Sequence, residues 1–287
     1  MTRIGAHVSS AGGCSRAFAR ALEIEAEAVQ VFLSAPQRWK EPVIPPAEAE
    51  AFRRERVGAG IPAFAHAIYL VNLASGDTAL VRRSVDSLAV SLGLCNQLGI
   101  RGLIFHVGSH LGAGFDAILP GVGTAVAEVL AAAPGDALLL LENNAGQGGG
   151  VGGTFTELGA IIRAAGSHPR LGVCIDTCHA FAMGYDLANA EGVAAMMDEF
   201  DREVGRERLA AVHANDSKTP LGGVRDRHEN IGDGHVGLDG FAAVLAHPAF
   251  ADATFLLEVP GLAGNGPDLE NVRRLKAIRA GIRAARR

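Results

Sequence analysis

The sequence predicts an α/β fold, a (β/α)8 TIM barrel, on three observations. First, eight short apolar runs alternate with eight amphipathic stretches along the 287 residues. Second, the runs are nearly continuous in apolar residues, which indicates strands buried on both faces, as in parallel sheets. Third, eight βα units use nearly all of this length. A series of this kind favours a closed barrel over an open sheet.

The individual elements follow from the spacing of apolar residues. The expected strands are Arg3–His7, Ala28–Leu33, Ile61–His66, Gly102–His106, Ala137–Glu142, Leu171–Asp176, Leu209–His213 and Thr254–Glu258. The expected helices are Ser15–Ile24, Ala47–Ala59, Arg82–Gln97, Gly121–Ala133, Thr156–Ala165, Gly192–Val204, Phe241–Ala246 and Asp268–Ala284. No composition shift marks a boundary, so we expect residues 1–287 to form a single domain.

Composition excludes several classes of protein. With 48% apolar and 20% charged residues, the chain is neither disordered nor collagen-like. We expect no transmembrane helix, no signal peptide and therefore no membrane partner. The four cysteines are too scattered for a disulfide framework, which favours the cytoplasm. Two of them, Cys174 and Cys178, are interpreted as small buried packing groups.

Net charge does not decide whether the partner is a nucleic acid. The formal charge of −5 argues weakly against one, since such affinity depends on neutralising phosphates. Three bound divalent cations, however, would bring the total to about +1.

Seven of the eight expected strands end in an ionisable side chain. These are His7, His66, His106, Glu142, Asp176, His213 and Glu258. Packing alone does not produce this pattern. Because the carboxyl ends of barrel strands meet at one mouth, we expect these residues to converge there.

Nine residues are candidate metal ligands: His66, His106, Glu142, Asp176, His179, His213, Asp226, His228 and Glu258. Imidazole and carboxylate donors suit zinc, with manganese or iron as competitors. Nine groups are too many for one tetrahedral ion, and they fit three ions with one carboxylate bridging two. Such a cluster clamps a phosphate and activates water, which indicates phosphodiester hydrolysis.

Five segments resemble the signatures of the endonuclease IV family, the zinc-dependent DNA repair nucleases that act at apurinic or apyrimidinic sites. The segments are Gly5–Ser9, Phe105–His110, Glu142–Gly148, Cys174–His179 and Asp226–His228. The resemblance implies a TIM barrel with three zinc ions. It assigns His66, His106 and Glu142 to the first ion. The second ion takes Glu142, Asp176, His213 and Glu258, and the third takes His179, Asp226 and His228.

The resemblance also implies the reaction and its substrate. The enzyme would hydrolyse the phosphodiester 5′ to an abasic site in double-stranded DNA, leaving a 3′-hydroxyl, and would trim blocked 3′ ends. Glu142, Asp176 and Glu258 would be the catalytic carboxylates. Tyr69 and Leu70 match the residues that the family inserts into DNA, and Arg38 stands one place away from the family's arginine. We expect a monomer.

Two other functions remain open from the sequence. A metal-dependent sugar isomerase or epimerase also gathers histidines and carboxylates at barrel strand ends, but the third ligand set argues against it. A DNA-binding module without catalysis would be favoured by a missing ligand, and all nine positions are filled.

Overall fold

The computed structural model describes residues 2–285, and within them eight parallel strands close into a barrel. The strands are β1 (Arg3–His7), β2 (Val29–Phe32), β3 (Ala63–His66), β4 (Gly102–His106), β5 (Leu138–Glu142), β6 (Leu171–Asp176), β7 (Leu209–His213) and β10 (Thr254–Leu257). They follow one another around the barrel in chain order, and β10 closes it by pairing with β1. The predicted TIM barrel is confirmed.

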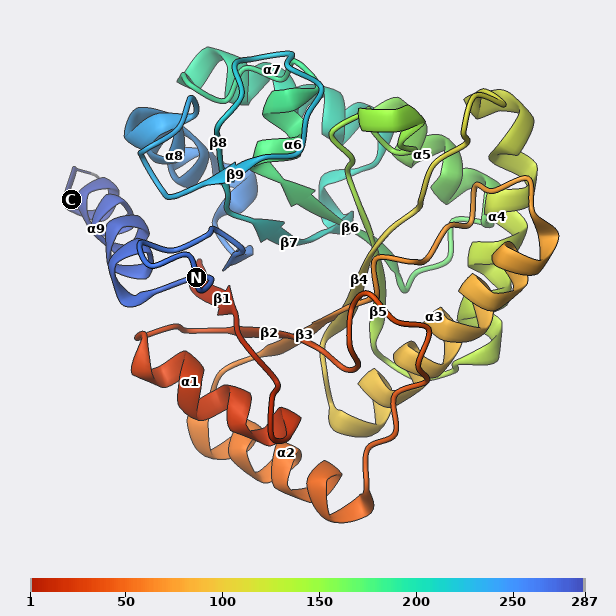
Figure 1. The fold of residues 1–287 in the computed structure, drawn as a ribbon. Helices are drawn as coiled ribbons and strands as arrows, with labels where there is room; N and C mark the ends of the chain where they lie inside the picture. The colour runs from red at the N-terminus through yellow and green to blue at the C-terminus, as the bar shows by residue number, and fades with distance from the viewer. Residues whose placement is uncertain (1, 286–287) are drawn as a thin grey trace.

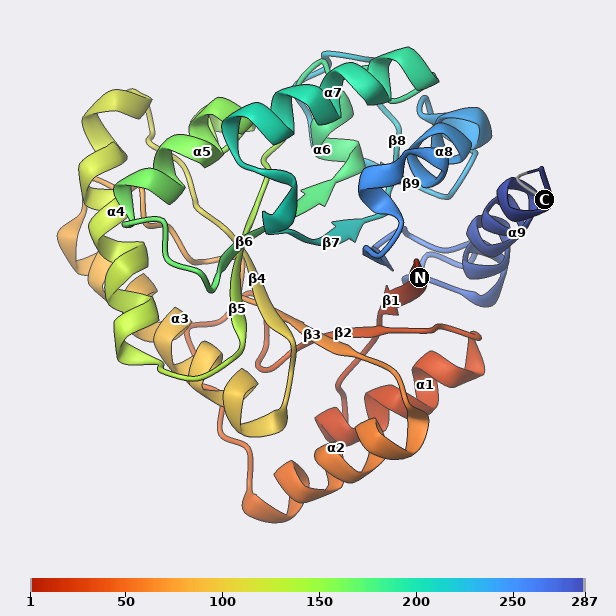
Figure 2. The same cartoon turned by 180° about the vertical axis from the view of Figure 1, so that it is seen from behind.

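The helices form a ring around these strands (Figure 1). They are α1 (Ala17–Glu23), α2 (Pro46–Ala59), α3 (Thr78–Leu98), α4 (Phe115–Ala132), α5 (Phe155–Ala164), α6 (Thr177–Ala182), α7 (Ala190–Glu203), α8 (Gly237–Ala246) and α9 (Leu269–Ala285). Seen from behind, the same ring surrounds the barrel, with α9 beside the N-terminal strand (Figure 2).

One short helix and one hairpin were not expected from the sequence. The short helix α6 directly follows β6, and a hairpin of β8 (Asp216–Ser217) and β9 (His228–Glu229) follows β7. Both are too short to show a helical or strand period, so only the folded structure reveals them.

Helix α4 begins at Phe115, six residues before the expected start, and runs through Pro120. A proline inside a helix costs about 3 kcal/mol, so packing must outweigh it. Phe115, Ile118 and Leu119 supply that packing, because they lie against the hydrophobic core. By length and apolarity α4 is long enough to cross a membrane. It nevertheless packs between α3 and α5 as one helix of the ring.

The pleat of the strands points alternate residues into the barrel. One inward layer contains Ala28, Phe64, Ile104, Leu140, Cys174, Ala211 and Leu256, which form a separate buried cluster. The residues two positions further along share the same inward direction, nearer the carboxyl ends. They are Gln30, His66, His106, Glu142, Asp176, His213 and Glu258. On β1 the corresponding pair is Gly5 and His7. A Cβ at Gly5 would lie 2.4 Å from the carbonyl oxygen of Ala28, so only glycine fits there.

Candidate metal centre

The structure gathers all nine candidate ligands at the carboxyl ends of the strands, in three groups of possible metal ligands. The groups are His66, His106 and Glu142; Glu142, Asp176, His213 and Glu258; and His179, Asp226 and His228. Within each group the donor atoms lie within 4.8 Å of one another. The membership of each group is the one that the family resemblance implies.

Glu142 joins the first two groups. Its Oε2 lies 3.1 Å from His66 Nε2 and 3.6 Å from His106 Nε2. Its Oε1 lies 2.9 Å from His213 Nδ1 and 3.4 Å from His179 Nδ1. The side chain is only 1% exposed, so both oxygens are committed to this cluster. One carboxylate with an oxygen in each group has the geometry of a bridge.

The third group is built by α6 and the β8–β9 hairpin. Asp176 is the N-cap of α6, and its Oδ1 accepts a hydrogen bond from the backbone N–H of His179 at 2.8 Å. This cap fixes the turn that carries His179. Asp226 lies 3.2 Å from His179 Nε2 and 3.2 Å from His228 Nε2, one oxygen to each. Its side chain is half exposed, so this group is the one nearest solvent.

Backbone carbonyls orient three of the histidines. The Nδ1 atoms of His66, His179 and His228 lie 2.7, 2.9 and 3.3 Å from the carbonyl oxygens of Ala67, Asn143 and Glu258. A carbonyl only accepts, so each Nδ1 carries a proton. His66 and His228 therefore present Nε2 to the carboxylates, as metal-binding histidines require. His179 turns Nε2 toward Asp226, while its Nδ1 also lies 3.4 Å from Glu142.

The cluster strongly perturbs the protonation of its members. Burial disfavours the charged form of His179, yet Asp176, Asp226 and Glu142 raise its pKa to about 10. Burial also opposes protonation of His228, but Asp176 and Asp226 raise its pKa to about 9. Burial favours the neutral form of Glu142, yet His106 and His213 hold its pKa well below the usual range. Without a cation, protons on imidazoles balance the buried carboxylates.

The donor set fits divalent metal ions. Among the described residues, two buried ring nitrogens have no hydrogen-bond partner, His106 Nδ1 and His179 Nε2. The latter lies 3.2 Å from an Asp226 oxygen without hydrogen-bond geometry, as when two ligands aim at a common point. Nitrogen and oxygen donors in this proportion suit zinc.

The expected DNA contacts lie on the rim. The Tyr69 side chain is exposed, and its ring centroid stands 5.7 Å from that of His66. Its backbone N–H donates to the carbonyl of Pro36 at 2.9 Å, which links this loop to the one that carries Arg38. Arg38 is exposed, whereas Leu70 is half buried against the hydrophobic core.

Sequence reasoning missed the amides that hold the carboxylates. Asn143 Oδ1 accepts from the backbone N–H of Asp176 at 2.6 Å. Asn215 donates to Asp176 Oδ2 at 2.7 Å and accepts from the N–H of Glu258 at 2.8 Å. The sequence did carry a signal for Asn143 and Asn215, because each is a polar residue one or two positions past a strand-end ligand. Gln30, inside β2, is the third such amide.

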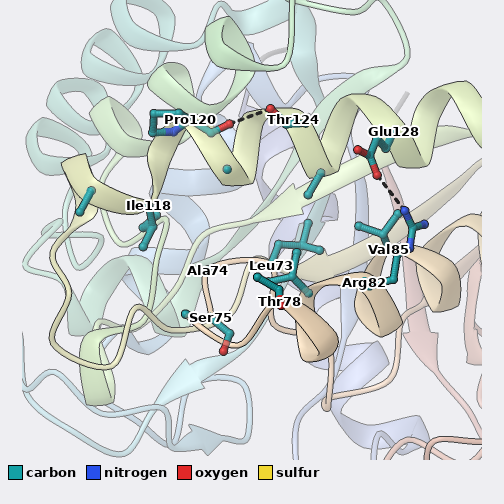
Figure 3. A pocket seen from close by; sticks show the side chains of 15 residues that line it. Leu73, Ala74, Ser75, Thr78, Arg82, Val85, Ile118, Pro120, Thr124 and Glu128 are labelled. Atoms are coloured by element: carbon teal, nitrogen blue, oxygen red, sulfur yellow. Dashed lines mark hydrogen bonds and ion pairs between the residues drawn. The ribbon is translucent and has the colours of Figure 1, made fainter.

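Two other features do not contribute ligands to these groups. Cys178 forms a fourth group of possible ligands with Asp176 and His228. Without a metal ion, burial raises the pKa of its thiol to about 12. A groove of about 650 Å³ lies between α3 and α4 beside the loop that precedes α3, and none of the nine candidate ligands lines it (Figure 3). Its charged lining residues, Arg82 and Glu128, pair with each other at 3.0 Å.

Fold and site together define a TIM-barrel protein that gathers groups of possible metal ligands at the barrel mouth. The family described as xylose isomerase-like TIM barrel matches residues 18–286. The probable endonuclease 4 of Halorhodospira halophila is 42% identical, over 95% of this chain and 98% of that protein. The crystal structure of endonuclease IV from Thermus thermophilus is 36% identical with a TM-score of 0.84, over 97% and 99% of the two chains.

The chain belongs to the endonuclease IV family, so the predicted family is confirmed. It is therefore a nuclease of the hydrolase class. The D-psicose 3-epimerase of Clostridium cellulolyticum is also similar, with a TM-score of 0.67 over 98% of each chain. At 12% identity that likeness shows only a shared fold.

Proposed function

We propose that this protein cuts double-stranded DNA at abasic sites, hydrolysing the phosphodiester on the 5′ side and leaving a 3′-hydroxyl. We propose further that it trims blocked 3′ ends, and that residues 1–287 act as one domain and as a monomer in the cytoplasm. The observation that carries the proposal is the set of three donor groups, two of which share Glu142, in a member of the endonuclease IV family.

The nine residues would hold three metal ions in the groups described, zinc by donor chemistry and manganese or iron as substitutes. When bound, such ions polarise a phosphate, lower the pKa of water and stabilise a leaving oxygen. The role of Glu142, Asp176 and Glu258 is to supply fixed negative charge that orients the donors. Burial keeps Glu142 and Asp176 in one arrangement before substrate arrives, and contacts with His7, Gln30 and His213 hold the partly buried Glu258.

The rim residues would present the substrate. An abasic nucleotide has lost the stacking and pairing of its base, so extruding it from the duplex costs less than extruding a normal nucleotide. Tyr69 is an exposed aromatic ring above the first group, which suits stacking on an opened base step. Leu70 and Arg38 would support it, through apolar contact and phosphate contact respectively.

The test is cleavage of a duplex oligonucleotide with one abasic site, with and without a chelator, and with the undamaged duplex as control. We expect one cut 5′ to the site that is lost on chelation and restored by zinc. A second duplex with a blocked 3′ end tests trimming. Turnover of a ketose without cleavage of DNA would instead assign the centre to an epimerase.

A further inference from the structure

One strand breaks the pattern of ionisable strand ends. The run Ala28–Leu33 ends in leucine, whereas the other seven end in histidine or a carboxylate. In the structure the inward position of this strand at the level of the cluster is Gln30, two residues beyond the buried Ala28. Gln30 is fully buried, and β1 places His7 directly beside it. An uncharged amide therefore completes the circle of inward side chains.

The Gln30 side chain contacts two members of the second group. Its Nε2 lies 2.6 Å from Glu258 Oε1, and its Oε1 lies 2.9 Å from His213 Nε2. A carboxylate oxygen accepts hydrogen bonds and does not donate them, so the amide nitrogen must face Glu258. The reverse orientation of the Gln30 amide would place its oxygen 2.6 Å from the Glu258 oxygen. Glu258 thus fixes the direction of the amide.

The fixed amide in turn selects the tautomer of His213. Because Gln30 Oε1 only accepts, His213 Nε2 carries the proton and donates it. The remaining nitrogen, Nδ1, faces Glu142 Oε1 at 2.9 Å and Glu258 Oε2 at 3.3 Å. The other oriented histidines present Nε2 and are held by backbone carbonyls, so His213 is reversed and is held by a side chain.

We propose that Gln30 is a positioning residue of the metal centre, which keeps His213 Nδ1 and the Glu258 carboxylate directed at the second ion. The proposal rests on the proposed metal centre. Residues that orient metal ligands in this way contribute about 10- to 100-fold to metal affinity. The amide does this without charge, and it contacts ligands from two different strands through one rigid group.

Gln30 Nε2 also lies 2.9 Å from His7 Nδ1. Two variants separate the contact with His213 from the contacts of Nε2. Gln30→Met keeps the length of the side chain and removes all three contacts. Gln30→Glu keeps the size and an acceptor toward His213, but places an oxygen against Glu258. The matched control is Asn271→Leu, which removes a buried amide that bonds Asn230, Asp268 and the Ile231 N–H and none of the nine candidate ligands.

The measurements are zinc affinity, by competition with a chelator, and the protonated nitrogen of His213, by nitrogen-15 NMR of the zinc-loaded, histidine-labelled protein. We expect Gln30→Met to bind one of three zinc ions about 10- to 100-fold more weakly and to lose the pure Nε2–H signature. Gln30→Glu should retain that signature but bind zinc more weakly. This variant therefore tests the role of Gln30 even if the methionine variant does not fold. Asn271→Leu should change neither reading.

Wild-type zinc affinity in both Gln30 variants, with the His213 signature unchanged, would overturn the role of Gln30. Failure of the metal centre itself is distinguishable, because the wild-type protein would then bind no stoichiometric zinc.

Discussion

Replacing Glu142 with glutamine tests the bridge between the first two ligand groups. The substitution keeps shape and volume but removes one negative charge from a side chain that is 1% exposed. It also places an N–H₂ group against an imidazole nitrogen, either His66 Nε2 at 3.1 Å or His213 Nδ1 at 2.9 Å. An amide nitrogen has no lone pair for a metal, so one group loses a ligand.

The size of the effect follows from the number of contacts. Glu142 lies within 3.6 Å of four ring nitrogens, and breaking a buried charge network by removing one partner costs about 3–5 kcal/mol. For activity, loss of one preorganised group of an active site lowers the rate about 10²- to 10³-fold, and we expect cleavage of an abasic duplex to fall by at least this factor. Binding of the damaged duplex should largely survive, because the rim residues are unchanged.

The assay is single-turnover cleavage of a labelled abasic duplex, with metal content measured on the same preparation and duplex affinity measured separately. Glu128→Gln is a suitable control, since Glu128 is a half-exposed surface residue paired with Arg82 on the groove between α3 and α4. Cleavage by the Glu142→Gln protein at the wild-type rate would refute the bridging role.

Three further outcomes are expected. Tyr69→Ala should weaken binding of the abasic duplex about 5- to 100-fold, by loss of stacking, and leave zinc content unchanged; equal affinity in a binding titration would contradict insertion. Chelation should abolish cleavage and lower the melting temperature, because ions that bind only the folded state stabilise it; a melting curve unaffected by chelator would argue against resident metal. Glu27→Gln should destabilise the fold by about 1–2 kcal/mol at neutral pH. Burial opposes ionisation of Glu27, but Arg279 and the Ile4 N–H lower its pKa from 4.5 to about 2. The contribution of the Glu27 carboxylate to the free energy of unfolding is therefore present above pH 4.5 and lost as the pH falls through 2. The expected loss of about 1–2 kcal/mol is smaller than the full pKa shift implies, because solvent screens a side chain that is one-third exposed. Urea unfolding at pH 7 and at about pH 2 checks this, and a difference that persists at the lower pH would contradict it.

The barrel was predictable because its strands are local features. Strands such as Arg3–His7 and Leu171–Asp176 have the bounds that their apolar runs predict. A parallel strand that is buried on both faces requires a continuous apolar run in the sequence. Helix α4 shows the limit of that reasoning, because the packing of Phe115 and Ile118 outweighs the proline that ordinarily ends a helix. That packing involves residues distant in the chain.

By itself, the sequence determined the order of strands and helices and the kinds of donor at the strand ends. It also carried the motifs that place the chain in its family. The family resemblance also implied which donors share a group. Only the tertiary structure showed the distances within each group, which nitrogen each histidine presents, and that Gln30 fills the inward position of β2 at the level of the cluster. The physical reason is that a ligand set is defined by distances such as 3.6 and 3.8 Å across a closed barrel. Ring closure sets those distances, and no local pattern along the chain records them.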